Sequence, residues 1–358
     1  MTLIITVDCG VSAVEEVARA AELGVDVVVT DHHEPGRRVP RACAVVNPKL
    51  TGCLYPYREL AGVGVAFKLA WALAQSYSQG TRVTDEFRQF LLDAMGLVAL
   101  GTVADVVPLT GENRVLATYG LHALRHSTSP GIMALVRQAG ASGRALTPRD
   151  VSFRLGPRLN AAGRLGAADV CVELLTSDDL ERAAAIARQL EDTNKERRQI
   201  QTEILGEALE RLAGLDGLDQ RRSIVLADPD WHAGVLGIVA SRIAEDYHRP
   251  TLLLSLDGEV ARGSARSVPG VNLFEAIEAC EEVLLAYGGH SGAAGVKLGD
   301  LLRQQLPPRV RRQAHQLEVR PQAAQHVQRA SADGARRAQN RHPLHRASHI
   351  PWGEVTSL

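Results

Sequence analysis

Two short apolar runs near the start of the chain, each ending at an aspartate, constrain the fold more than any other feature. Residues 3–7 lead into Asp8 and residues 25–30 lead into Asp31, with an alanine- and glutamate-rich stretch between them. Continuous apolar strands on either side of a helix predict a βαβ unit of a parallel sheet covered on both faces. Functional groups in such sheets collect at the carboxyl ends of the strands, so Asp8 and Asp31 are expected at one edge.

The second run leads directly into the triplet Asp31-His32-His33. Carboxylate and imidazole groups at the mouth of a strand suit a divalent ion, with Mn²⁺ favoured over Ca²⁺ because imidazole takes part. A lone triplet of this kind also suits a solvated loop, but Asp8 lies one βαβ unit upstream and favours metal binding. With a later aspartate, the inventory suits a two-metal site that activates water and neutralises charge on a phosphoryl group. The candidate ligands are Asp8, Asp31, His32, His33 and Asp105.

An arginine-rich segment, residues 154–164, is the first candidate for anion binding. Its small residues would let the backbone approach a ligand, and Arg158 and Arg164 carry guanidinium groups whose shape matches phosphate oxygens. An ordinary inter-domain loop with solvated arginines is the alternative. Three arginines within eleven residues, set among Gly and Asn, favour the functional interpretation.

Two glycine-containing segments late in the chain are further candidates for anion binding. Residues 263–267 are predicted to form a short polar turn in which Ser264 and Arg266 could hold a terminal phosphate, although the pattern is weak and a plain turn is its first interpretation. In residues 288–295, backbone amides near Gly289 could face an anion while His290 adds a donor or proton-transfer group. A purely structural tight turn is the alternative there.

The order of predicted elements indicates two α/β units joined by a long helix. That helix covers about residues 177–212, and its middle, residues 191–198, is almost wholly polar, as in helices that bridge domains. A second α/β unit begins with a strand at residues 223–227. The predicted division is a first domain at 1–176, a connector helix at 177–215, a smaller domain at 216–296 and a basic tail of low order at 297–358.

Charge and cysteine content exclude several classes of protein. The formal net charge of −1 argues against coating of nucleic acid by bulk electrostatics. This neutrality is an average, because the segment from Lys297 onward holds eleven Lys or Arg against four Asp or Glu. No run of about 18 apolar residues is present, so no membrane span is expected. Five scattered cysteines without a C-x-x-C pair indicate neither a disulfide framework nor a thiolate zinc site, which favours the cytoplasm.

Several spaced motifs resemble those of the DHH phosphoesterase superfamily. They are residues 5–10, Ile-Thr-Val-Asp-Cys-Gly; residues 31–35, Asp-His-His-Glu-Pro; and residues 101–109, Gly-Thr-Val-Ala-Asp-Val-Val-Pro-Leu. The arginine segment, the helix after Trp231-His232 and the segment at Gly289-His290 are similar to the RecJ-type branch, the single-strand-DNA-specific exonucleases. The resemblance covers about residues 3–296.

The resemblance implies a parallel-sheet DHH domain joined by a long helix to a smaller α/β DHH-associated domain. It implies Mn²⁺- or Mg²⁺-dependent 5′-to-3′ hydrolysis of single-stranded DNA to mononucleotides in recombination and repair. By motif, all five candidate ligands above would hold metal, and catalytic roles would fall to His33, Asp105 and Arg164. Substrate-binding roles would fall to Arg158, Arg164, Ser264, Arg266, Gly289 and His290, with Ser264 and Arg266 on the 5′ phosphate.

Two departures from the family pattern lead to further expectations. The family carries an aspartate-rich motif on a strand ahead of the one ending at Asp8, and its absence here predicts impaired metal binding and activity. The tail matches no family sequence, which predicts either a frameshift near residues 297–300 or a natural basic tail that binds nucleic acid.

Two other functions compete with the exonuclease, namely a DHH-type phosphatase of oligonucleotides or nucleotides and a non-catalytic DNA-binding scaffold. The arginine segment and residues 101–109 speak against the phosphatase, and retention of all five candidate ligands speaks against the scaffold. The expected partner is single-stranded DNA with a 5′ phosphate. A monomer is expected, with no membrane association, and a single-strand-binding protein or a helicase is a candidate protein partner.

Overall fold

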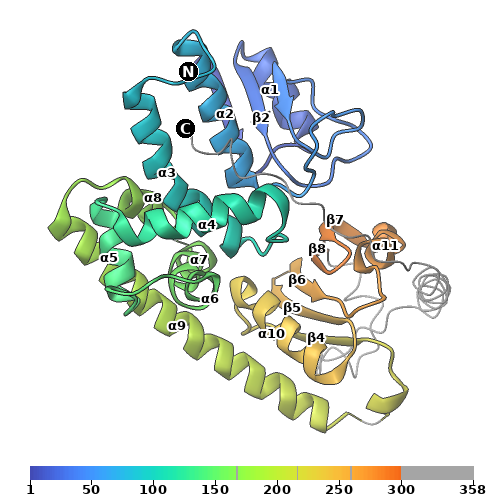
Figure 1. Cartoon of the computed structure of the whole chain (residues 1–358). Helices are drawn as coiled ribbons and strands as arrows, with labels where there is room; N and C mark the ends of the chain where they lie inside the picture. Colours follow the sequence, from blue (N-terminus) through green and yellow to red (C-terminus); the bar gives the residue numbers. More distant parts are fainter. Residues whose placement is uncertain (167, 216, 259, 300–358) are drawn as a thin grey trace, which may run out of the picture. The chain divides into compact units, whose positions relative to one another are not determined.

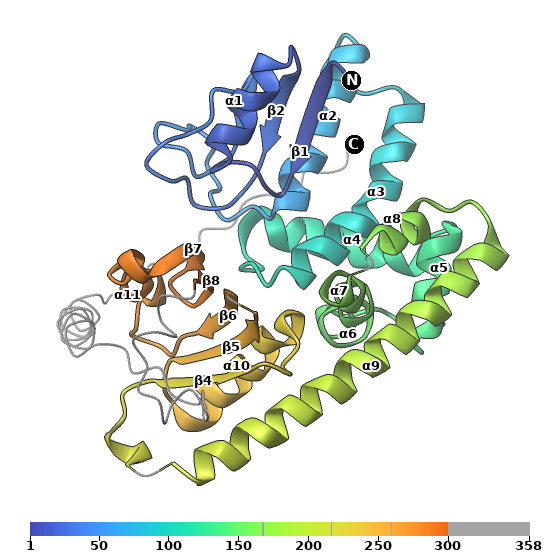
Figure 2. The ribbon, with the colours of Figure 1, turned by 180° about the vertical axis from the view of Figure 1, so that it is seen from behind.

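A computed structural model describes residues 1–166, 168–215, 217–258 and 260–299 of the protein. These residues divide into two compact units, Met1–Thr193 and a second that begins at Asn194 (Figures 1 and 2). The division falls inside the polar stretch 191–198 of the long helix. The expected basic tail lies outside the described residues, apart from its first three.

The first unit opens with the predicted βαβ arrangement. Strand order in its sheet is β1-β2-β3, all parallel, and helix α1 packs its Val17 near Val27 and Val29 of β2. The expected cover on both faces holds at β2, where Val29 is fully buried, but not at the edge strand β1, where Ile5 stays half-exposed. These elements are β1 (Leu3–Val7), α1 (Val14–Glu22), β2 (Asp26–Thr30) and β3 (Ala44–Val46).

Helices make up the rest of the first unit. Helix α3 packs along α4, and the contact is close because Gly120 lies against the backbone of Met95, where a Cβ atom would come within 2.2 Å of the carbonyl oxygen. By length and composition alone α3 could cross a membrane, yet its buried residues belong to the core of this unit. The elements are α2 (Gly62–Tyr77), α3 (Asp85–Ala104), α4 (Gly111–His126), α5 (Pro130–Gln138), α6 (Pro148–Asp150), a π-helical turn (Val151–Leu155), α7 (Gly156–Leu165) and α8 (Asp169–Thr176).

The predicted long helix is present as α9 (Leu180–Ala213). Asp179 caps its start, because its Oδ1 accepts hydrogen bonds from the backbone N–H groups of Glu181 and Arg182 at 2.8 and 3.2 Å. Part of its polar middle is buried: Asn194 is fully covered and its Oδ1 accepts a 2.7 Å hydrogen bond from Arg197. The polar residues of this stretch therefore include packed groups as well as solvated ones.

The second unit is a mixed sheet with strand order β4-β5-β6-β8-β7. β4 and β5 are parallel neighbours, and the other pairs are antiparallel. Helix α10 contacts β5 and β6. The elements are a 3₁₀ turn (Leu218–Gln220), β4 (Ile224–Asp228), α10 (Ala233–Tyr247), β5 (Thr251–Asp257), β6 (Val260–Arg266), α11 (Leu273–Glu278), a 3₁₀ turn (Glu281–Val283), β7 (Leu284–His290) and β8 (Ala293–Leu298).

Two segments expected to be a loop and a turn are regular elements. The arginine segment forms the π-helical turn and helix α7, and the predicted turn 263–267 lies mostly in β6. Residues 288–295 form the end of a β7–β8 hairpin, with a tight turn at residues 291–292. Glycines of the last two segments have packing roles. A Cβ on Gly263 would come within 2.4 Å of Leu254, and one on Gly289 within 2.3 Å of the Ala293 carbonyl oxygen. Here glycine permits close packing within the sheet.

Candidate metal centre

Asp31 is buried, and its carboxylate accepts the hydrogen bonds that hold the loop after β2. Its Oδ2 accepts a 2.9 Å hydrogen bond from the backbone N–H of Val11. Its Oδ1 accepts from the backbone N–H groups of His32 and His33 at 2.7 and 3.1 Å and lies 2.7 Å from Nδ1 of His33. Burial alone would raise the pKa of Asp31, but the hydrogen bonds from Val11, His33 and His32 outweigh it and lower that pKa. Asp31 therefore stays ionised and fixes the His33 ring.

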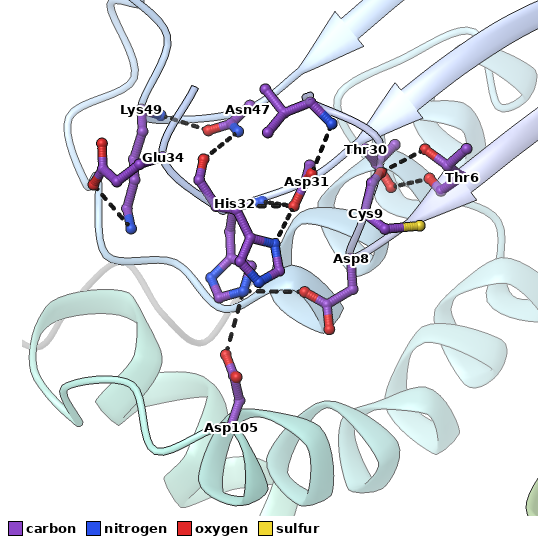
Figure 3. Close-up of polar contacts among 12 residues, drawn as sticks. Thr6, Asp8, Cys9, Thr30, Asp31, His32, Glu34, Asn47, Lys49 and Asp105 are labelled. Atoms are coloured by element: carbon purple, nitrogen blue, oxygen red, sulfur yellow. Dashed lines mark hydrogen bonds and ion pairs between the residues drawn. The ribbon is translucent and has the colours of Figure 1, made fainter. Parts of the chain in front are cut away.

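His32 lies between two carboxylates from distant parts of the chain. Its Nε2 is 3.0 Å from Oδ1 of Asp8 and 3.4 Å from Oδ2 of Asp105 (Figure 3). The contact with Asp8 raises the pKa of His32, burial opposes that rise, and the charge of Asp105 adds to it. Two carboxylates and one imidazole nitrogen thus converge on one point.

The backbone is strained beside both of these carboxylates. Asp8 adopts φ 63° directly after β1, and Val106, which follows Asp105 at the end of α3, also adopts φ 63°. A left-handed conformation is costly for a β-branched residue such as valine. The backbone N–H of Asp8 is fixed by a 2.9 Å hydrogen bond to the carbonyl of Thr30. Strain at one candidate ligand and directly after another is the pattern found where geometry matters for function.

The donor set fits a divalent transition metal. One ligand atom each from Asp8, His32 and His33 lies within 4.8 Å of the others, and Oδ2 of Asp105 lies 3.4 Å from Nε2 of His32. Within the described residues, Nε2 of His32 is buried, and its contacts with Asp8 and Asp105 are ion pairs. A buried imidazole nitrogen between carboxylates is what Mn²⁺, with oxygen and imidazole ligands, would satisfy.

Several supporting residues of this centre were missed from the sequence. Asn47, which follows β3, is buried and donates a 2.9 Å hydrogen bond to the His33 carbonyl oxygen. Gly62 starts α2 against Asp8, since a Cβ atom there would come within 2.1 Å of Oδ1. The fully buried Asn113 lies near the start of α4. Neither Asn47 nor Asn113 stands in a recognisable pattern, whereas the repeated glycines of residues 62–64 are a signal of close approach that could have been used.

The two arginines of α7 differ in their surroundings. Arg158 is 9% exposed, and its guanidinium pairs with Glu191 of α9 at 2.5 Å and donates to the carbonyl of Arg154. Arg158 therefore lies in a buried ion pair and not on an open surface. Arg164, near the end of α7, is half-buried, and burial lowers its pKa. Of the two, Arg164 is the more exposed.

In the second unit, the sheet register brings the other predicted residues together. Arg266 of β6 and His290 of β7 both pair with Ala293 of β8, so the two lie on either side of it in one cross-strand row. Residues in such a row project from one face of the sheet. Ser264 lies two residues from Arg266, on the same face, and its Oγ accepts a 3.0 Å hydrogen bond from Nη1 of Arg266.

The face that carries this row is the one against α10. A Cβ atom on Gly237 of α10 would come within 2.6 Å of Nη2 of Arg266 and 2.9 Å of Oγ of Ser264. Gly237 therefore gives these two side chains the room they occupy. Gly289 pairs with Ala294, the residue next to Ala293, and so lies on the other face of the sheet from Arg266 and His290.

Two protein-family models match the chain, one in each unit. Residues 2–102 match the DHH family, N-terminal domain, and residues 221–314 match the DHHA1 domain. The second match and strand β8, which ends at Leu298, both extend beyond the predicted domain end at residue 296.

Curated relatives and solved structures agree with these matches. The single-stranded-DNA-specific exonuclease RecJ of Bacillus subtilis is 46% identical over 299 residues, which are 83% of this chain and 36% of the relative. RecJ of Escherichia coli is 41% identical over 310 residues, 83% of this chain and 53% of that protein. The chain thus spans about a third to a half of the length of these relatives.

The solved structures extend the likeness to three dimensions. A RecJ structure with Mn²⁺ from Thermus thermophilus superposes with a TM-score of 0.74 at 35% identity, over 92% of this chain and 49% of that one. A crystal structure of exonuclease RecJ bound to manganese has a TM-score of 0.67 at 38% identity, over 85% of this chain and 72% of that one.

Proposed function

The chain belongs to the RecJ-type branch of the DHH family, and on that premise we propose that it hydrolyses single-stranded DNA, using Mn²⁺ or Mg²⁺. The proposed reaction proceeds from the 5′ end and releases mononucleotides, in the service of recombination and repair. The observation that carries this proposal is the convergence of Asp8 and Asp105 on the buried Nε2 of His32.

The residues of the first unit would divide the work of metal binding. Asp8, His32, His33 and Asp105 would ligate the metal, which when bound supplies an activated water and neutralises charge on the scissile phosphate. The geometry favours Asp31 as the residue that orients His33, because its oxygens already accept hydrogen bonds from three residues. Asp31 stays a candidate ligand in addition.

Phosphate recognition would use arginine and serine side chains. Ser264 and Arg266 share a face of the second sheet with His290, which supports their assignment to the 5′ phosphate. Gly289 would contribute by letting the β7 and β8 backbones approach. Arg164 would assist near the scissile group, and Arg158 would act through its ion pair with Glu191, by holding α7 in place.

A single assay tests the proposal. The full chain is given a 5′-phosphorylated single strand with and without Mn²⁺, and released mononucleotides are measured for the protein and for His32→Ala. We expect Mn²⁺-dependent release that falls by at least about 100-fold in His32→Ala, because the removed ring provides the buried ligand atom. His126→Ala is the matched control, since His126 is an exposed histidine on α4.

Three results would contradict the proposal. Release that persists in His32→Ala would show that this centre does not perform the reaction. Faster turnover of a dinucleotide than of a long strand would indicate the phosphatase instead. DNA binding without any Mn²⁺ uptake, measured by calorimetry, would indicate the scaffold.

The setting and partners form a further part of the proposal. We place the protein in the cytoplasm as a monomer that meets single strands held by a single-strand-binding protein or opened by a helicase. Cys9, Cys43, Cys53 and Cys171 form no disulfide among the described residues, which supports a reducing compartment.

A further inference from the structure

The first turn of α4 contacts the loop that leads into α2. The hydroxyl of Tyr57 donates a 2.7 Å hydrogen bond to the carbonyl of Thr110, and its ring lies so close to Gly111 that a Cβ there would come within 2.6 Å. The hydroxyl of Tyr55 donates to the carboxylate of Glu112. Residues 110–112 at the start of one helix thus hold two tyrosines of one loop, Tyr55 and Tyr57.

Asn113, the next residue of α4, makes the most buried of these contacts. It is 0% exposed. Its Nδ2 donates hydrogen bonds to the carbonyls of Glu59 at 2.5 Å and Pro108 at 3.1 Å, and its Oδ1 accepts from the backbone N–H of Ala61 at 3.2 Å. Both amide protons and the oxygen are therefore used.

The two segments that Asn113 joins lead to two different ligands of the metal centre. Ala61 immediately precedes Gly62, whose backbone lies against the carboxylate of Asp8. Pro108 lies three residues after Asp105, beyond the strained Val106. A shift of either segment would therefore change how one carboxylate meets His32.

We propose that Asn113 is a positioning residue of the metal centre, which holds the Asp8 and Asp105 segments at the spacing that metal binding requires. The identity of the metal rests on the proposed function, but the positioning role rests only on the contacts of Asn113. Outer residues that orient metal ligands typically change metal affinity by about 10–100-fold when they are altered.

Two substitutions remove the tie in different ways. Asn113→Ala leaves the Ala61 N–H and two carbonyls without their buried partner. Asn113→Asp keeps the volume and an acceptor for Ala61, but replaces the amide donor by a carboxylate oxygen facing two carbonyls, so it tests the role where the alanine variant fails to fold. Asn194→Ala is the matched control, because Asn194 is also a fully buried, hydrogen-bonded asparagine on a helix.

The experiment combines Mn²⁺ calorimetry with hydrogen exchange on the full chain. We expect both Asn113 variants to bind Mn²⁺ at least about 10-fold more weakly. We also expect faster exchange in residues 59–64 and 105–109. The control should retain the Mn²⁺ affinity and the exchange rates of these two segments.

Other outcomes overturn the inference. Unchanged Mn²⁺ affinity with faster exchange would show that Asn113 holds the two segments but does not affect metal binding. Unchanged exchange in both segments would show that Asn113 does not hold them. If the unaltered chain takes up no Mn²⁺, the proposed function fails, and exchange alone then decides the positioning role.

A third variant reaches the same ligand without touching Asn113. Gly62→Ala would place a methyl group within 2.1 Å of Oδ1 of Asp8, so we expect a comparable loss of Mn²⁺ affinity. Gly206→Ala in α9 is its control, since nothing lies within 4 Å of a Cβ there. Normal Mn²⁺ binding by Gly62→Ala would show that the Asp8 segment tolerates displacement, which contradicts the inference.

Discussion

At the scale of single residues, the aspartate of the Asp31-His32-His33 triplet has a different local setting from its two histidines. Sequence reasoning placed all three side chains at a metal because all three can ligate one. The structure adds that Asp31 is 1% exposed and saturated with hydrogen bonds, whereas the His32 and His33 rings face the other ligand groups.

Asp31→Asn tests the role of this carboxylate. One oxygen becomes an NH₂ group, which must face a donor at Val11 or at His33, and the charge beside the His33 ring is lost. We expect Mn²⁺ affinity to fall about 10–100-fold and the free energy of unfolding to fall by about 1–3 kcal/mol. Calorimetry and urea denaturation measure the two effects.

Glu34→Gln is the matched control for this change. Glu34 lies in the same loop and pairs with Lys49 through a carboxylate that is 65% exposed, so its neutralisation should leave both quantities nearly unchanged. Wild-type Mn²⁺ affinity in Asp31→Asn would show that Asp31 neither ligates the metal nor orients His33 for metal binding.

The candidate metal ligands could be selected from the sequence, but the residues that support them could not. Asp8 and Asp31 follow apolar runs, and parallel pairing alone brings such positions together. Asn113 and Asn47 act through hydrogen bonds to backbone groups of other segments, and such bonds leave no periodic trace in a sequence. Asp105 was added to the candidate ligands as an aspartate of a later segment, and strand pairing could not place it because it follows a helix and not a strand.

At the scale of elements, glycine misled the sequence interpretation of β6. Glycine commonly indicates a turn, but at Gly263 and Gly289 it allows neighbouring side chains and backbone to pack. The packing at Gly263 involves Val296 of β8, and β8 is distant from Gly263 in the sequence. The long helix α9 was predictable because helical composition is local.

Helix α6 offers an element-scale test of stability. Asp150 and Thr147 form a reciprocal capping box at its start, and Asp150 also pairs with Arg144. The Arg144 guanidinium is the main cause that lowers the pKa of Asp150 below its usual 3.8, against burial, with help from Thr147. We expect Asp150→Asn to reduce the free energy of unfolding by about 1–2 kcal/mol at neutral pH.

The pH dependence follows from the sign of that shift. A carboxylate with a lowered folded-state pKa contributes stability that is fully present above its unfolded value, near 3.8, and is lost as the pH falls toward the folded value. The difference between wild type and Asp150→Asn should therefore shrink in urea unfolding at acid pH. Asp169→Asn, in the first turn of α8, is the control, and a pH-independent difference would contradict the capping role.

At the scale of the whole molecule, the net charge of −1 requires that DNA binding depend on a few local contacts. Each phosphate contact adds about 0.7 to the salt dependence of single-strand binding. We expect Arg266→Gln to reduce the slope of log affinity against log salt by about 0.7, measured by anisotropy with a 5′-phosphorylated strand without added metal.

Two comparisons make this salt prediction specific. Arg242→Gln on α10, where the arginine is exposed and pairs with Asp246, should leave the slope unchanged. On a strand with a 5′ hydroxyl, Arg266→Gln and wild type should bind alike. Equal slopes for Arg266→Gln and wild type on the phosphorylated strand would show that Arg266 does not contact the 5′ phosphate.

The left-handed backbone at Asp8 has a consequence for how this gene can vary. Asparagine and glycine are the residues that adopt φ near 63° most readily, so both satisfy the fold at this position, yet neither supplies a carboxylate. Glutamate supplies the carboxylate but tolerates the backbone poorly. Asparagine or glycine at this position would therefore preserve the fold but remove the carboxylate. Aspartate meets both demands.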